Sequence, residues 1–190
     1  MKNNILIILI MFLLSCTGSK DLMEVKQVFS DEKVSLAVDS SNIDSINIIL
    51  PVEFQLKNIS KKVADVRLYY MIDKVMLRQI QDFKIYNGDT GKIIYAIEDL
   101  QYNEFPSKII LKQSNYKISR QDAEILLKKY NKISVEDLPK QKETNLVPYT
   151  TLRKENPEIV KNLEKNPDSL ILSIAVLKEK PQIIRKKINW

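Results

Sequence analysis

Residues 46–58, INIILPVEFQLKN, contain the clearest strand pattern of the chain. Every second residue from Ile46 to Leu56 is apolar, and most of the residues between them are polar. An alternation with a period of two predicts a β-strand that buries one face. Pro51 cannot donate a backbone hydrogen bond, so we expect this strand to lie at a sheet edge or to kink at that residue.

Similar alternations and short apolar runs on both sides of this stretch predict further strands. They cover residues 32–38, 64–72, 83–86, 92–97, 109–111, 170–176 and 184–190. The sequence Asn87-Gly88-Asp89-Thr90-Gly91 predicts a hairpin turn, because glycine readily adopts positive φ angles. Asn87 and Asp89 are also oxygen ligands of the calcium type. The twelve-residue calcium loop with its closing glutamate is absent from the sequence, and turn chemistry explains every residue of the segment.

The period changes from two to that of a helix at Ser119. Ser119 and Asp122 approximate a capping box, and an apolar stripe spaced i, i+3, i+4 and i+7 follows them (Ala123, Leu126, Leu127, Tyr130). The pattern predicts a helix of about twelve residues that ends near Asn131. Such a stripe is typical of core packing more than of a groove for a partner.

The chain between this helix and the last strands has weaker signals. Asn156 followed by Pro157 predicts a short helix over residues 157–163, because proline is favoured at the first helical position. Residues 133–149 are polar, contain two prolines and indicate no regular element. We therefore interpret residues 119–167 as an insertion that precedes a C-terminal hairpin.

The strand of residues 46–58, the Asn58-Ile59-Ser60 turn and the strand of residues 64–72 together resemble the opening hairpin of immunoglobulin-like and related bacterial adhesive modules. The resemblance implies an immunoglobulin-like antiparallel β-sandwich. Combined with the helix at Ser119, it predicts a mainly β domain over residues 32–190, with one main α-helix and the long insertion.

The N-terminal residues indicate export. Lys2 precedes an apolar run over residues 5–14, and no acidic residue occurs before Asp21. A basic start, a ten-residue apolar core and a small residue are typical of a secretory signal peptide, here residues 1–15. The run is too short for a transmembrane helix, which needs about 20 apolar residues.

Leu13-Leu14-Ser15-Cys16 resembles the lipobox of bacterial lipoproteins. The resemblance implies cleavage between Ser15 and Cys16, a diacylglyceryl group on the thiol and usually an acyl chain on the new α-amino group. Two or more chains hold a protein stably on a membrane, whereas one holds it only marginally. Residues 16–31 would then be a lipidated tether in the bacterial envelope, at the outer membrane rather than the inner one. The alternative is an ordinary signal peptide with an incidental cysteine.

Composition excludes several kinds of site. The chain has no histidine, and Cys16 is its only cysteine. Ser-His-Asp and Cys-His nucleophile pairs, zinc or haem sites made of these residues, and disulfides within the chain are therefore excluded. Three glycines provide no phosphate-binding loop, and a net charge of +6 without a basic-aromatic motif does not favour nucleic acid. We expect no cofactor and no metal.

Candidate contact residues come from the eight tyrosines and their aromatic neighbours. Tyr69 alternates with the apolar face of its strand, so we expect it on the opposite face. Tyr102 and Phe105 occur in a loop, where exposed aromatic rings contact proteins or glycans. The alternative is that the tyrosines cover the edges of a small core.

These observations predict a lipid-anchored envelope lipoprotein that acts as a non-catalytic binding or assembly module. Its membrane contact would be the acyl chains on Cys16, and its partner another envelope protein or a glycan. One alternative is a small hydrolase of envelope polymers that uses a carboxylate pair. Adjacent acids such as Glu136-Asp137 are poor candidates, because neighbours on a strand point to opposite faces. A purely structural lipoprotein is the other alternative.

Overall fold

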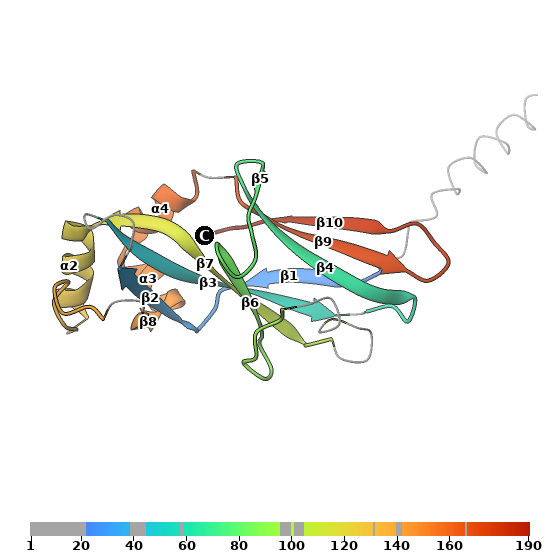
Figure 1. Cartoon of the computed structure of the whole chain (residues 1–190), viewed down its shortest axis with the longest axis horizontal. Helices are drawn as coiled ribbons and strands as arrows, with labels where there is room; N and C mark the ends of the chain where they lie inside the picture. Colours follow the sequence, from blue (N-terminus) through green and yellow to red (C-terminus); the bar gives the residue numbers. More distant parts are fainter. Residues whose placement is uncertain are drawn as a thin grey trace, which may run out of the picture.

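The computed structural model describes residues 22–38, 45–57, 59–95, 100, 105–130, 132–139, 142–165 and 167–190 (Figure 1). In these residues the chain is mainly β, and two antiparallel sheets enclose one hydrophobic core. The prediction of a mainly β fold with two antiparallel sheets is confirmed. Its immunoglobulin-like character stays a prediction.

The larger sheet, sheet A, has six strands among the described residues, in the order β6-β7-β3-β2-β8, with β1 also paired to β3. Their bounds are β1 Glu24–Val28, β2 Lys33–Val38, β3 Ser45–Lys57, β6 Phe83–Asn87, β7 Lys108–Ser119 and β8 Thr144–Pro148. The strand predicted over residues 46–58, β3, is therefore the central strand. Its apolar residues from Ile46 to Leu56 are buried, as their alternation predicts.

Pro51 lies in this central strand and not at an edge. On one side of β3, β2 pairs with residues 46–49 and β1 pairs with residues 53–57. The amide of Leu56 donates to Ser107 on the opposite, β7 side. Backbone groups alternate along a strand, so the position of the missing Pro51 N–H faces the gap between β2 and β1. The proline therefore costs no ladder hydrogen bond.

The smaller sheet, sheet B, has the order β10-β9-β4-β5. Its strands are β4 Val63–Ile72, β5 Val75–Met76, β9 Ser169–Val176 and β10 Gln182–Lys187. Along β9 buried and half-buried residues alternate without exception, which is the pattern of a sheet with one face in the core. The predicted C-terminal hairpin is formed by β9 and β10.

Three helices are described, and they gather at one end of the molecule (Figure 1). Their bounds are α2 Arg120–Lys129, α3 Tyr149–Glu155 and α4 Pro157–Leu163. The hydroxyl of Ser119 accepts the amide of Asp122 at 3.0 Å, which confirms the predicted cap of α2. The side chain of Asn156 makes no capping bond to α4, although Pro157 begins that helix as predicted.

Several predicted boundaries are wrong. Residues 22–28 were assigned to a tether, but Met23 and Val25 are buried and β1 pairs with β3, so the folded domain includes them. The insertion contributes β8 to the edge of sheet A and contains α3, where no element was expected. Of the return strand predicted over residues 92–97, the described residues 92–95 form one bridge, between Tyr86 and Ile93, and residues 96 and 97 lie outside the described residues.

A buried polar cluster joins the two sheets at the chain terminus. Asp168, immediately before β9, accepts hydrogen bonds at Oδ2 from Tyr70 of β4 (3.1 Å), Trp190 Nε1 (3.0 Å) and Tyr116 of β7. Asp168 is the only charged residue fully buried in the described chain. Burial raises the pKa of Asp168 above its ordinary value, and the bonds from the two tyrosines and the tryptophan oppose that shift. We call these four residues the Asp168 cluster.

Candidate functional site

The strongest candidate site lies along the open edge of β4. The neighbouring strand β5 pairs only with Met71 and Ile72, so residues 66–69 have β9 on one side and no strand on the other within the described chain. We call residues 66–69 the β4 edge. An open strand edge presents backbone N–H and C=O groups to any extended chain that approaches it.

The direction of these backbone groups follows from one hydrogen bond. The carbonyl of Tyr70 accepts the amide of Leu77, so Tyr70 directs its backbone groups away from β9. Alternate residues of a strand point their backbone groups to the same side. Leu68 and Val66 therefore direct their N–H and C=O groups outward, whereas Arg67 and Tyr69 bond toward β9.

A pocket of about 200 Å³ borders this edge. One wall consists of the β4 edge, and the other of Gln79, Ile94, Tyr95 and Leu100. The side-chain amide of Gln79 donates to the carbonyl of Ile94 at 2.6 Å, and the amide of Ile94 donates to Ile85 of β6 at 2.8 Å. These bonds fix the second wall to sheet A. The pocket thus lies between the two sheets.

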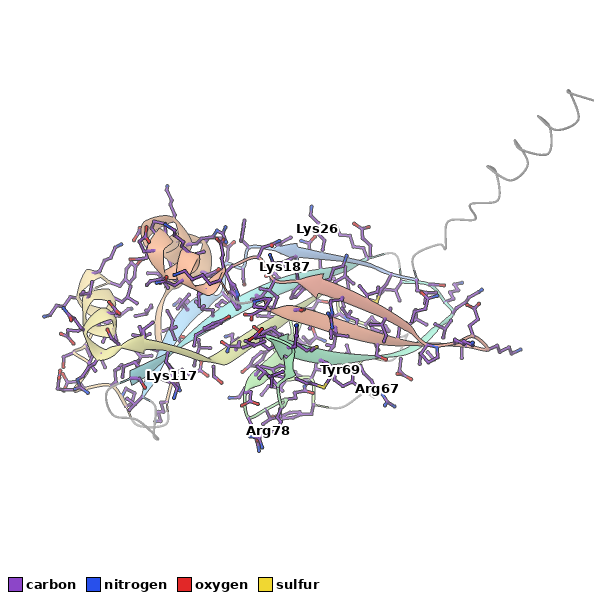
Figure 2. All side chains as sticks on the ribbon, turned by 90° about the horizontal axis from the view of Figure 1, so that it is seen from above. Lys26, Arg67, Tyr69, Arg78, Lys117 and Lys187 are labelled. Carbon is purple, nitrogen blue, oxygen red and sulfur yellow. The ribbon has the colours of Figure 1, made fainter. Side chains whose placement is uncertain are left out.

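The side chains at the pocket are apolar, aromatic and cationic. Tyr69 and Arg67 lie next to each other on the outer face of β4 (Figure 2). Arg67 is exposed, Tyr69 is half-buried and Tyr95 on the opposite wall is 64% exposed. Aromatic rings beside a guanidinium are residue types enriched where proteins contact one another. The predicted contact residue Tyr69 therefore lines a pocket.

The outer face of sheet B continues this surface. Arg67 lies opposite Ser173 of β9, which lies opposite the 71%-exposed Ile183 of β10. Two residues further along β4, Tyr69 lies opposite Ile171 of β9, which lies opposite Arg185 of β10. Nη2 of Arg185 contacts Met71 Sδ at 3.7 Å. The face is amphipathic, with exposed cations beside half-buried apolar side chains.

The other edge of sheet B differs in chemistry. Its strand β10 ends with Arg185, Lys186 and Lys187, and Figure 2 shows Lys187 on that strand, away from Arg67 and Tyr69. Charged side chains on an edge strand discourage pairing with another chain. Immediately after β10, Asn189 exchanges two hydrogen bonds with the side chain of Gln27 on β1. The β4 edge is the less protected of the two.

A second pocket, of about 420 Å³, lies between the end of β7, the start of α2 and α4. Two carboxylates line it, Asp122 and Glu158, together with Tyr116, Lys117 and Ser119. The carboxylate of Asp122 accepts the hydroxyl of Ser119 at 2.7 Å as part of the helix cap. The sequence carries no local signal for this pair, because its members are far apart in the chain and belong to different helices.

The other acidic candidates are engaged elsewhere. Glu136 pairs with Arg120 at 2.7 Å, and that hydrogen bond lowers the pKa of Glu136. In the predicted hairpin turn, Asn87 Oδ1 accepts the amides of Asp89 and Thr90, while the Asp89 carboxylate accepts the amide and hydroxyl of Ser107. The turn is therefore bonded to protein groups, and no metal-binding cluster occurs in the described residues.

The remaining predicted site residues are placed as follows. Phe105 is half-buried and packs against the hydrophobic core, which makes it a packing residue and not an exposed contact. Tyr102, Ser15 and Cys16 lie outside the described residues.

Comparison of the chain with protein-family models, with curated proteins and with solved structures finds no match in any of the three. Among the helices of the described residues, none combines the length and the apolar character that a membrane span requires.

Proposed function

We propose that the protein is a bacterial envelope lipoprotein, anchored by acyl chains on Cys16, whose folded domain binds an extended segment of another envelope protein at the β4 edge. The anchor is supported by the lipobox resemblance of residues 13–16. The binding mode is supported by one structural observation, the open edge of β4 beside a pocket.

Strand addition fits the chemistry of this edge. The outward N–H and C=O groups of Val66 and Leu68 would pair with a bound strand, and every second side chain of that strand would face the pocket. Main-chain bonds supply affinity in this mode, and the pocket supplies specificity. Tyr69, Tyr95 and Arg67 favour an incoming strand with apolar and acidic side chains.

The anchor would hold the domain close to its membrane. Only residues 17–21 separate Cys16 from Leu22, where the described fold starts. Even fully extended, the link from Cys16 to Leu22 spans no more than about 20 Å. A module confined in this way meets membrane-associated partners at a raised effective concentration.

The anchor is tested with Cys16→Ala. We expect loss of metabolic acyl labelling and release of the protein from the membrane fraction. A Cys16→Ala protein that still carries label, or a wild-type protein that still begins at Met1, would refute the anchor.

The binding site is tested by placing a photo-crosslinking amino acid at Tyr95, with Ile125 of α2 as the matched control. Both positions are exposed, at 64% and 56%, but Ile125 lies at the helical end. We expect one protein adduct at Tyr95, none at Ile125, and loss of the adduct when Leu68 is replaced by proline. That substitution removes a donor facing the open edge and leaves the bonds to β9 in place. Adducts that survive Leu68→Pro, or a glycan adduct, would contradict strand addition.

The alternative of a hydrolase has one specific observation in its favour, the pocket that contains Asp122 and Glu158. Glycosidase chemistry requires two carboxylates across a cleft. If the protein degrades an envelope polymer there, Glu158→Gln abolishes the activity while crosslinking at Tyr95 is unchanged. If no activity is detectable with purified envelope polymers, this alternative is rejected.

A further inference from the structure

Two turns and the start of β1 meet at the end of the molecule opposite the helices (Figure 1). The carbonyl of Leu22 accepts the amide of Ser60, in the turn between β3 and β4. That turn contacts the β9–β10 turn, because the amide of Leu177 donates to the carbonyl of Lys62 at 2.9 Å. The chain segment that leads back to Cys16 therefore enters the domain beside both turns.

Lysines dominate this end. The last residue of β3 and the two turns contribute five exposed lysines, which we call the lysine end (Lys57, Lys61, Lys62, Lys178, Lys180). The neighbouring described acids are Glu24, opposite Lys57 on β1, Asp65 near the start of β4, and Glu179, whose carboxylate bonds Lys62 at 2.7 Å. Five lysines against these three acids give a local net charge of +2. Lys62 is the only member with an ion pair in the described structure.

The β9–β10 turn also exposes an apolar side chain between the charges. Leu177 is 56% exposed and immediately precedes Lys178. Lys178 has a positive φ of 60°, a conformation that glycine or asparagine adopts more readily than lysine. Packing does not explain either residue, since both point to solvent. An apolar residue flanked by lysines matches the interface of an anionic membrane, where acyl chains and phosphates occur at adjacent depths.

We propose that the lysine end lies against the headgroups of the membrane that holds the anchor, and that it binds anionic phospholipid. The inference rests on the proposed anchoring at Cys16 for its biological setting, but the charge pattern is independent of it. Each lysine near an anionic bilayer strengthens binding about fivefold, and a second weak attachment makes a lipid anchor more stable.

Such contact would orient the domain. β4 starts at the lysine end, and its open edge at residues 66–69 follows a few residues along the strand. The helices would then point away from the bilayer (Figure 1). A partner strand would reach the β4 edge from the side, close to the headgroups, which favours membrane-bound partners over soluble ones.

The test uses the mature chain, residues 16–190, with Cys16→Ser, so that neither signal peptide nor acyl chain contributes. This chain contains every residue of the hydrophobic core, which starts at Leu22. Sedimentation with vesicles of phosphatidylcholine alone is compared with sedimentation with vesicles that also contain phosphatidylglycerol. We expect binding only to the anionic vesicles, and weakening as salt screens the charges.

A pair of variants separates the lysine end from the overall charge. Neutralising Lys57, Lys61, Lys178 and Lys180 to glutamine removes four factors of about five and is expected to weaken binding by up to about 600-fold at low salt. The matched control neutralises four lysines near the helices, which are also exposed (Lys132, Lys142, Lys154, Lys161). We expect less than a threefold effect from the control. Circular dichroism and urea midpoints verify that both variants are folded.

Three outcomes would overturn the proposal: equal losses in both variants, no binding to anionic vesicles, or equally tight binding to the soluble polyanion heparin, which would indicate an acidic glycan as the ligand. Failure of this proposal can be distinguished from failure of the proposed acyl anchor. Vesicle binding without acyl labelling of the native protein rejects the anchor and keeps the lysine end, whereas labelling without vesicle binding does the reverse.

Discussion

The Asp168 cluster makes the sharpest prediction about stability, because one carboxylate oxygen serves three donors from different parts of the chain. Replacing Asp168 by alanine removes the acceptor that two phenols and one indole N–H share in the core. Each buried donor that loses its partner costs about 1–3 kcal/mol. The sum is an upper bound, because the three donors share one space and relax together.

We therefore expect Asp168→Ala to lower the free energy of unfolding by about 3–5 kcal/mol, the cost typical of removing one partner of a buried charge network. Domains of this size are stable by roughly 5–15 kcal/mol. The loss corresponds to a decrease of about 2 M in the urea midpoint and about 10 °C in Tm. Asp137→Ala, at an exposed aspartate, is the control and should change stability by less than about 0.5 kcal/mol.

Asp168→Asn separates hydrogen bonding from charge. The asparagine keeps an acceptor for the three donors, and its NH₂ replaces Oδ1, which has no partner within the described structure. We expect a smaller loss of unfolding free energy than for alanine, about 1–2 kcal/mol at neutral pH. The loss arises because the buried NH₂ group of the asparagine has no acceptor.

The asparagine variant also reports on the proton of Asp168. Burial raises the folded-state pKa of Asp168 above the value of an unfolded aspartate, so the folded chain binds this proton more tightly. The contribution of this proton to the free energy of unfolding is fully present below the pKa of the unfolded aspartate. It is lost as the pH rises through the raised pKa of the folded state. We therefore expect urea unfolding to give a larger difference in unfolding free energy, in favour of wild type over Asp168→Asn, at pH 4.5 than at pH 7.

Either of two results would show that Asp168 does not stabilise the fold in this way. One is an Asp168→Ala protein within about 1 kcal/mol of wild type, which would mean that the donors find other acceptors. The other is a wild-type advantage over Asp168→Asn that grows as the pH is raised, which would mean that the hydrogen bonds outweigh burial in setting the pKa.

Three further predictions concern single sites. Gln113 is fully buried and neither polar atom of its side chain has a partner in the described structure, so Gln113→Met should raise the unfolding free energy by about 1 kcal/mol, visible as a higher Tm. Asp73 and Lys74 form the tight β4–β5 turn at φ 44° and 67°, and Lys74→Gly should raise the urea midpoint by relieving about 1 kcal/mol of strain, whereas a lower midpoint would show that the turn is unstrained. Ser119→Ala should lower stability by about 1 kcal/mol through loss of the α2 cap, and Ser119→Asp should restore it.

The parts of the fold that were predicted correctly have local causes. β3 alternates over six apolar positions, α2 has its cap and stripe within twelve residues, and the turn at Asn87 has its side-chain acceptor two residues from the amide it bonds. In each case the residues that determine the element are inside it. Periodicity and capping are then sufficient to predict the structure.

The elements that were missed are short and depend on distant partners. β1 and β8 have five residues each, too few for a clear period, and they are strands because β3 and β2 offer them unpaired edges. For Pro51 the sequence predicts a sheet edge or a kink, because its own strand cannot reveal that the pairing partner changes from β2 to β1 beside it.

The candidate site could be predicted only in part for the same reason. The alternation of β4 places Tyr69 on the outer face. However, nothing within β4 shows that its neighbouring strand β5 pairs no further than Met71. Likewise Asp168 has the sequence features of a helix stop. Its partners Tyr70 and Tyr116 lie 98 and 52 residues away, so their convergence is a property of the assembled sheets.

The Asp168 cluster and the β4 edge are also coupled through one strand. Tyr70, which bonds Asp168, directly follows Tyr69, and its carbonyl holds the amide of Leu77 at the start of the wall that faces the edge. Sheet B meets sheet A through side-chain packing at the core, through this cluster and, beyond β10, through the two hydrogen bonds between Asn189 and Gln27. We expect a loosened cluster to let β4 shift relative to Gln79 and Ile94 before the sheets themselves unfold. For this reason we expect Asp168→Ala, at a temperature where the protein is still folded by circular dichroism, to reduce crosslinking at Tyr95 while acyl labelling at Cys16 stays intact. Undiminished crosslinking would show that the pocket is held by the remaining core alone.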